Sequence, residues 1–267
     1  MVIHRLPIIL TNEWTSDCRE FLSEQTKTEE TKEDKPVEVF NIATPRSQCP
    51  NCQHKITAIE NIPIISWLFL RGRCSSCHNK ISIRYPLIEL STALFSILVA
   101  YTFGVQWFTL AALVLTWSMI SLALIDFDTQ LLPDNITLPI MWMGVLMSLL
   151  SISPISLEDS IIGLLLGYLS LWSIYHLFKI ITGKEGMGYG DFKLLALLGA
   201  WLGWQSLPLI LFLSAVVGSI VGISLILFLG RDKNIPIPFG PYLASAGFIS
   251  LIWGQQIKQT YFALVFH

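Results

Sequence analysis

The amino-acid sequence predicts a mainly α-helical protein, a polytopic membrane helix bundle of about seven transmembrane helices behind a polar N-terminal domain. Of its 267 residues, 53% are hydrophobic and only 13% are charged, whereas soluble domains carry about 25% charged residues. Long apolar runs follow one another after residue 86, and two cysteine pairs precede it. This composition excludes an ordinary soluble enzyme, and the net charge of −2 argues against a nucleic-acid-binding protein, which needs a basic surface.

The uneven placement of charge predicts two domains, over 1–86 and 87–267. Residues 1–86 hold 11 of the 17 Lys and Arg residues, and the other 181 residues hold six. The opening run Met1–Leu10 is short, contains Arg5 and has no small-residue cleavage site, so we expect no secretory signal there. We therefore predict that the polar domain is cytoplasmic.

Seven apolar runs in the second domain predict its helices, because about 20 apolar residues cross the roughly 30 Å of a bilayer core. The two short runs, 192–203 and 240–254, are expected to be partly buried in the bundle. With residue 86 in the cytoplasm, the Lys and Arg residues of the connections fall on the cytoplasmic side, in agreement with the positive-inside rule. The predicted helices are 87–103, 106–125, 136–152, 160–181, 192–203, 206–229 and 240–254.

Four aspartates, Asp126, Asp128, Asp134 and Asp191, fall on the cytoplasmic face in this topology. Ionisable groups at membrane depth are costly and usually functional. Asp126 ends an apolar run and Asp191 opens one, so the two could meet. Neighbouring carboxylates share a proton and can activate water and protonate a leaving group, as in aspartic proteases. We interpret Asp126 and Asp191 as a catalytic pair.

The other two aspartates have simpler interpretations. Asp134 precedes an apolar run and is expected to be a helix-capping or turn residue, and Asp128 is expected to be solvated in its loop. Glycines at alternate positions before Asp191 allow a close approach of backbone or substrate. As a hypothesis, the helix N-terminus favours an ionised Asp191 acting as base, with Asp126 as the protonated partner.

Two C-x-x-C pairs, Cys49 with Cys52 and Cys74 with Cys77, predict a tetrahedral zinc site in a zinc-ribbon-like domain. The alternative is two redox pairs or disulfides, which a reducing cytoplasm disfavours. Cys18 is interpreted as a free thiol, and His54 and His78 are surplus to four ligands.

Several further segments accompany these features along nearly the whole chain: HRLP at His4–Pro7, ENIP at Glu60–Pro63, RYPLIEL at Arg84–Leu90, IDFDTQLLPD at Ile125–Asp134, GMGYGDFK at Gly186–Lys193 and PIPFGPY at Pro236–Tyr242. Together they resemble the type IV prepilin peptidases, the bifunctional leader peptidases and N-methyltransferases of bacterial pilus and type II secretion systems. The family's catalytic aspartates fall on Asp126 and Asp191, and its zinc ligands on the four cysteines.

This resemblance implies a multi-pass enzyme of the bacterial inner membrane with its active site facing the cytoplasm. It implies removal of a short basic leader from prepilins or pseudopilins, cutting after a glycine, followed by methylation of the new N-terminal residue. The implied cofactors are a structural zinc ion and S-adenosylmethionine as methyl donor. Membrane lipid is the other expected partner. The PIPFGPY segment is expected either to hold the substrate backbone or simply to start a helix.

One departure from the family is expected to matter. Its members usually place a hydrophobic helix before the HRLP-like motif, whereas this chain starts at Met1, so a first transmembrane helix is expected to be missing. Residues 13–38 are interpreted as a solvated insert. Two alternatives stay open: a peptidase without methyl transfer, and a non-enzymatic membrane scaffold in which the cysteine domain recruits a partner.

Overall fold

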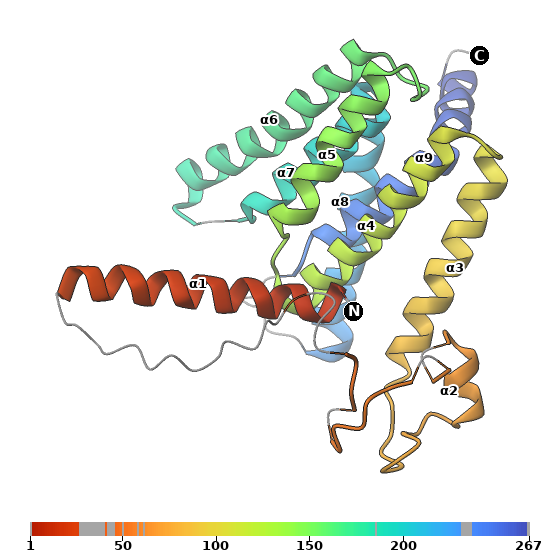
Figure 1. The fold of residues 1–267 in the computed structure, drawn as a ribbon. Helices are drawn as coiled ribbons and strands as arrows, with labels where there is room; N and C mark the ends of the chain where they lie inside the picture. The colour runs from red at the N-terminus through yellow and green to blue at the C-terminus, as the bar shows by residue number, and fades with distance from the viewer. Residues whose placement is uncertain are drawn as a thin grey trace. The chain divides into compact units, whose positions relative to one another are not determined.

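The computed structural model of the chain is mainly helical (Figure 1). It describes residues 2–26, 41, 46–49, 51–57, 59–60, 62–184, 186–230 and 237–265. The chain divides into two compact units, Met1–Phe95 and Ser96–His267, which are described separately below. Two of the Lys and Arg residues in the predicted cytoplasmic connections, Arg231 and Lys233, lie outside the described residues, as does Pro236 of the PIPFGPY segment.

The first unit contains α1 (Val2–Thr26), the short α2 (Ile65–Phe69) and the beginning of α3 (Arg84–Phe103). The sequence interpretation missed α1. Residues 13–26 of the predicted solvated insert belong to this helix, and the side chains described there are exposed, in agreement with solvation. Residues 27–38 of the insert lie outside the described residues. Between α1 and α3, two isolated β-bridges, Gln48 with Lys55 and Arg73 with Lys80, are the only extended pairings among the described residues.

The second unit contains the end of α3 and six further helices, so every predicted helix occurs. Some ends differ from the prediction: α4 continues through Asp126 to Thr129, and α9 continues past residue 254 to Val265. The apolar run ends at 254, but the Gln and Lys residues that follow are good helix formers. The helices are α4 (Trp107–Thr129), α5 (Asp134–Leu149), α6 (Leu157–Thr182), α7 (Tyr189–Leu202), α8 (Leu207–Leu229) and α9 (Gly240–Val265), with a 3₁₀ turn at Trp204–Ser206.

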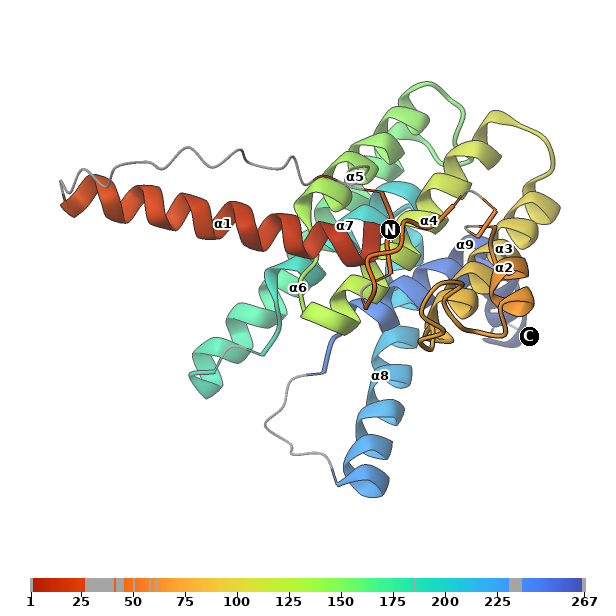
Figure 2. The ribbon, with the colours of Figure 1, turned by 60° about the horizontal axis from the view of Figure 1, so that its bottom comes forward.

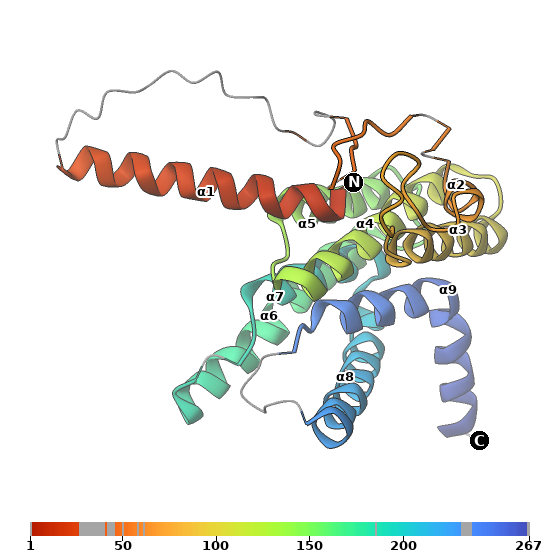
Figure 3. The ribbon, with the colours of Figure 1, turned by 90° about the horizontal axis from the view of Figure 1, so that it is seen from below.

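Four helical segments of the described chain are long and apolar enough to cross a membrane, so the chain is a membrane protein. They are Arg84–Phe103, Trp107–Thr129, Leu157–Thr182 and Trp204–Phe228. The total of seven spans stays a prediction. The remaining helices α5 and α7 are short, and the final part of α9 turns away from the direction of its first part (Figure 3).

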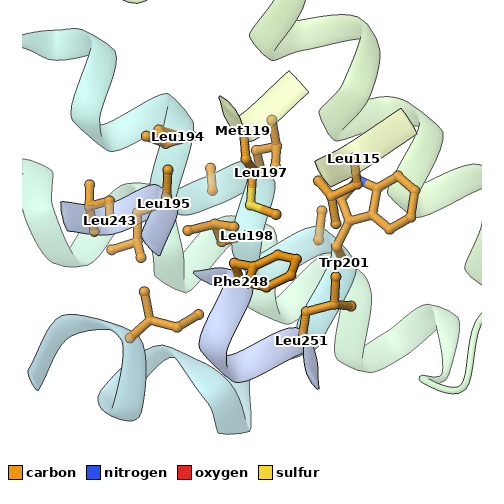
Figure 4. Packing of buried hydrophobic residues seen from close by; sticks show 14 of the residues in the cluster. Leu115, Met119, Leu194, Leu195, Leu197, Leu198, Trp201, Leu243, Phe248 and Leu251 are labelled. Atoms are coloured by element: carbon orange, nitrogen blue, oxygen red, sulfur yellow. The ribbon is translucent and has the colours of Figure 1, made fainter. Parts of the chain in front are cut away.

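The short helix α7 forms the centre of the second unit. It packs against α5, α6, α8 and α9, and its residues from Leu194 to Trp201 are buried. Figure 4 shows its leucines and Trp201 beside side chains from α4 and α9 that belong to the same hydrophobic cluster, among them Leu115, Met119 and Phe248. At 14 residues α7 is about 21 Å long, and a helix that is apolar all round belongs inside protein. The expected burial of 192–203 is confirmed.

Glycines bring the backbones of α6 and α7 close together, and the two helices lie in the same part of the second unit (Figure 2). A Cβ added at Gly163 of α6 would lie 2.2 Å from the carbonyl oxygen of Gly199 of α7, and one added at Gly199 would lie 2.1 Å from the oxygen of Gly163. A Cβ at Gly167 would meet the Leu195 carbonyl oxygen at 2.6 Å. Beside these contacts the Ser160 hydroxyl donates to the Ala200 carbonyl at 2.7 Å. This spacing of small residues allows close helix packing in membranes.

The glycine contact predicts that Gly199→Ala destabilises the second unit. The new methyl group meets backbone, which cannot move as a side chain can, so overpacking is expected to cost about 1–3 kcal/mol or more. The measurement is the midpoint of thermal unfolding of the purified protein in detergent. Gly222→Ala is the matched control, because a Cβ there meets only Cδ1 of Ile237, at 3.2 Å. Equal midpoints for the two variants would contradict the prediction.

Candidate active site and metal centre

Asp126 lies in the last turn of α4, four residues before the left-handed Gln130 that caps the helix. Its side chain is buried, and its Oδ2 accepts a hydrogen bond of 2.9 Å from the backbone N–H of Gly240, the first residue of α9. A Cβ at position 240 would lie 2.6 Å from that oxygen. The carboxylate therefore occupies space that only a glycine leaves open, and the start of α9 fixes it in place.

Asp191 is the third residue of α7 and so lies in the first turn of that helix. It is buried, with 8% of its surface exposed against 5% for Asp126. The two carboxylates are near enough to interact electrostatically. The structure thus brings together the two aspartates that the sequence singled out, and they are the only buried charged residues among those that the structure describes.

The other two aspartates have different surroundings. Asp128 is exposed near the end of α4. Asp134 is the first residue of α5, and both of its carboxylate oxygens accept from Nζ of Lys193, at 2.8 and 2.7 Å. The capping position of α5 belongs to Pro133 rather than Asp134. Sequence reasoning missed this ion pair, because nothing in the spacing of two residues 59 positions apart signals a contact.

The residue before Asp191, Gly190, also packs against the connection between α4 and α5. A Cβ added at Gly190 would lie 2.7 Å from Cβ of Leu132, in the connection between α4 and α5. Gly190 and Lys193 therefore both attach the first turn of α7 to residues 132–134. Since that connection follows directly from the end of α4, the same short stretch of chain relates the position of Asp191 to that of Asp126.

The four cysteines of the first unit form a compact cluster that could hold a metal ion. Their Sγ atoms all lie within 4.8 Å of one another. Across the two pairs, Cys49 Sγ lies 3.8 Å from Cys77 Sγ, and Cys52 Sγ lies 3.9 Å from Cys74 Sγ. Tetrahedral zinc with Zn–S bonds of about 2.3 Å requires sulfur atoms about 3.8 Å apart. The thiols are not joined as disulfides, and the donor set fits the metal geometrically.

The two halves of the cluster share one backbone conformation. The N–H groups of Cys49 and Cys74 donate to the carbonyls of His54 and Asn79, and those of Gln53 and His78 donate back to the two cysteine carbonyls. Gln53 and His78 both adopt positive φ, 57° and 55°. Backbone N–H groups of Cys52 and Asn51 lower the pKa of the Cys49 thiol to about 6, and those of Cys77 and Ser76 lower the pKa of the Cys74 thiol. These hydrogen bonds favour the thiolate, the form that binds metal, at Cys49 and Cys74, whereas burial and the neighbouring thiols raise the pKa of Cys52 to about 11.

Glu60 connects the two halves of the cluster. The Ser75 hydroxyl and the backbone and hydroxyl groups of Thr57 donate to its carboxylate, and these hydrogen bonds lower its pKa to about 2. Nε2 of His54 lies 3.5 Å from the same carboxylate. His54 therefore contacts Glu60, in agreement with its interpretation as surplus to the four ligands.

The PIPFGPY segment supplies the start of α9 at Gly240. Of its two interpretations, a helix start is therefore confirmed, and the hydrogen bond to Asp126 adds a role that the sequence did not indicate. Pro236 lies outside the described residues. A contact between this segment and a substrate stays a prediction.

Comparison with known proteins identifies the family to which the chain is similar. Residues 113–223 match the type IV leader peptidase family, and residues 1–103 match the bacterial peptidase A24 N-terminal domain. The chain is 55% identical to the prepilin leader peptidase/N-methyltransferase of Aeromonas hydrophila, over 98% of this chain and 88% of that protein. Its identity to the proteins of the same name from Pseudomonas aeruginosa and Legionella pneumophila is 49% and 40%, over 98% of this chain and 87% and 88% of theirs.

No solved structure is significantly similar to the chain. The family assignment therefore depends on the sequence relatives, which match it over nearly its whole length. Together with the helical membrane unit and the cysteine cluster, they establish that the chain belongs to the type IV leader peptidase family, as a prepilin leader peptidase/N-methyltransferase.

Proposed function

We propose that the protein removes the leader from type IV prepilins or pseudopilins at the cytoplasmic face of the bacterial inner membrane and then methylates the new N-terminal residue. The observation that carries the proposal is the buried pair Asp126 and Asp191 at the end of one apolar helix and the start of another. The relatives named prepilin leader peptidase/N-methyltransferase support both activities.

The aspartate pair is proposed to work without a covalent intermediate. One carboxylate takes a proton from a water molecule as the water oxygen attacks the carbonyl carbon of the scissile bond. The other carboxyl group gives its proton to the leaving nitrogen as the C–N bond breaks. The products are a free carboxyl end on the leader and a free amine on the pilin, and the pair again holds one proton.

The division of labour within the pair stays a hypothesis. Asp191 lies in the first turn of α7, the position on which its proposed role as the ionised base depends. Asp126, however, also faces a helix N-terminus, because Gly240 opens α9. The dipole of α9 therefore favours a charged Asp126, against the dipole of α4, and the Gly240 N–H holds its Oδ2 in one orientation.

The proposed orientation suits the substrate. Lys179 and Lys184 lie at and just beyond the end of α6, on the side where α7 begins with Asp191, and cytoplasmic loops are enriched in such residues. A prepilin has an apolar segment in the bilayer and its leader at the surface. A site at the ends of membrane helices would meet the scissile bond without extraction of that segment.

We further propose that Cys49, Cys52, Cys74 and Cys77 hold one structural zinc ion and that the first domain takes part in methyl transfer. The cluster geometry supports the metal. The proposed domains are 1–86 and 87–267, whereas the two compact units meet within α3, between Phe95 and Ser96. S-adenosylmethionine is the proposed methyl donor, and prepilins and membrane lipid, without nucleic acid, are the proposed partners.

Replacing either member of the pair is predicted to abolish prepilin cleavage. Asp126→Asn or Asp191→Asn removes a proton acceptor or donor, and general acid–base groups contribute about 10²–10⁴-fold to rates. The measurement is the cleavage rate of a prepilin by the purified protein in liposomes. Asp128→Asn is the matched control, because Asp128 is an exposed carboxylate only two residues from Asp126. Unchanged cleavage by both variants, at normal protein levels, would favour the scaffold alternative.

The ion pair between Asp134 and Lys193 is predicted to position Asp191. It is half exposed, so its loss is expected to change the free energy of unfolding by at most about 1 kcal/mol. Displacement of a catalytic group by about 1 Å can nevertheless cost about 100-fold in rate. Lys193→Met is therefore expected to lower kcat about 10–100-fold with little change in KM, measured on the same prepilin.

The charge-swapped double variant, Asp134→Lys with Lys193→Asp, serves as the rescue arm of this experiment. It restores an ion pair between α5 and α7 and is expected to recover part of the lost kcat. A wild-type kcat for Lys193→Met, or a double variant slower than Lys193→Met, would show that the pair does not position Asp191.

The metal centre predicts about one zinc ion per chain in folded, reduced protein. Cys74→Ser removes a buried ligand and is expected to release the metal and make the first unit sensitive to proteolysis, because zinc binding and folding are coupled in small domains. Elemental analysis and limited proteolysis check both effects. Cys18→Ser on α1 is the control, because this exposed thiol lies outside the cluster. A folded wild-type protein without zinc would contradict the prediction.

A further inference from the structure

The short helix α2 presents an apolar face that its own unit leaves uncovered. Ile65, Leu68 and Phe69 follow the i, i+3, i+4 spacing and therefore share one side of the helix. Their exposed fractions are 53%, 62% and 84%, and Ile62 just before the helix is 41% exposed. We call these four residues the α2 apolar face. Contiguous exposed apolar residues of this kind mark an interaction surface.

The orientation of α2 is fixed by its other side. The Trp67 ring covers Gly72, where an added Cβ would lie 2.9 Å from the ring, and its Nε1 donates to the carbonyl of Ile81 at 3.4 Å. The helix therefore cannot turn its apolar face inward without giving up these contacts. The packing of Trp67 against Gly72 and Ile81 therefore leaves the α2 apolar face exposed.

A hydrogen bond ties the start of α2 to α3. Oε2 of Glu89 accepts from the backbone N–H of Ile64 at 2.8 Å. Ile64 has a φ of 60°, a conformation that is strained for a β-branched residue and needs such support. Both residues belong to the first unit, so the attachment is independent of the placement of the two units.

The partner of Ile64 lies on a helix that can cross the membrane. Arg84–Phe103 is a candidate span, and Glu89 is five residues from its start, or about 7.5 Å along its axis. The headgroup regions add about 5–8 Å on each side of the hydrocarbon core. On α3, Tyr85, Leu87 and Leu90 are exposed on either side of Glu89. The α2 apolar face is thus attached near the start of a candidate membrane-spanning helix that also exposes apolar side chains.

Charge around the face favours an anionic surface. Arg71 and Arg73 follow directly after α2, and both are exposed. Between residues 59 and 84 there are four Lys and Arg residues and a single acidic residue, Glu60. The Glu60 carboxylate already accepts hydrogen bonds from Thr57 and Ser75. An apolar face flanked by basic residues is the pattern of segments that lie in the interface of anionic bilayers.

We infer that the α2 apolar face inserts into the headgroup region of a bilayer that contains anionic phospholipid, with Arg71 and Arg73 at the level of the lipid phosphates. The metal-binding unit is then held against the membrane by α2 as well as by α3. This inference concerns lipid contact alone and is independent of the peptidase and methyltransferase activities.

The experiment places a spin label at Phe69→Cys in a Cys18→Ser background, in the full chain loaded with zinc and reconstituted in phosphatidylglycerol nanodiscs. Accessibility is measured to oxygen, which concentrates in lipid, and to a water-soluble nickel chelate. A label at Lys55→Cys, an exposed position in the same unit, is the matched control. Zinc content identical to that of the parent shows that the labelled proteins are folded.

The oxygen-to-nickel accessibility ratio is expected to be several-fold higher at position 69 than at position 55. It is expected to fall in phosphatidylcholine nanodiscs and in the variant carrying Arg71→Gln and Arg73→Gln. Equal ratios at the two positions would overturn the inference, and so would shielding of position 69 that requires an added prepilin. A ratio that is the same in both lipids would overturn the assignment to anionic phospholipid.

Discussion

The burial of α7 is the constraint on which the second unit depends. A 14-residue helix that is too short to cross a bilayer alone must be surrounded by protein, and α5, α6, α8 and α9 surround it. Its first turn carries Asp191, so the packing of the apolar part decides where the carboxylate lies. Asp126 is fixed in the same way, by α9, which packs against both α4 and α7. Rigid helices rather than loops hold the proposed catalytic pair, as precise chemistry requires.

Hydropathy predicted the helices of the second unit because an apolar run of sufficient length has few alternatives in a membrane. It also located the two aspartates of the proposed catalytic pair, since a carboxylate directly after or before such a run is rare and costly. The cysteine pairs were equally informative, because the tetrahedral geometry of zinc restricts the spacing of its ligands.

Other features could not be predicted from the sequence for physical reasons. The contact of Gly240 with Asp126 joins residues 114 positions apart through a backbone N–H, which every residue except proline carries. The ion pair of Lys193 with Asp134 likewise depends on the tertiary arrangement of α5 and α7. The helix α1 was missed because its second half is polar and has no apolar periodicity. The extension of α9 was missed because the apolar run ends at residue 254, whereas the polar residues that follow still favour a helix.

The glycine contact between α6 and α7 restricts how the family can vary. Gly163 and Gly199 each face a backbone carbonyl of the other helix, so no change in a neighbouring side chain can make room for a larger residue there. Only a shift of a whole helix would compensate. Gly199 lies eight residues from Asp191 on the same rigid helix, about 12 Å away, so such a shift would also move the carboxylate. Purifying selection for activity should therefore act on these two glycines, although their only described role is to let two helices approach each other.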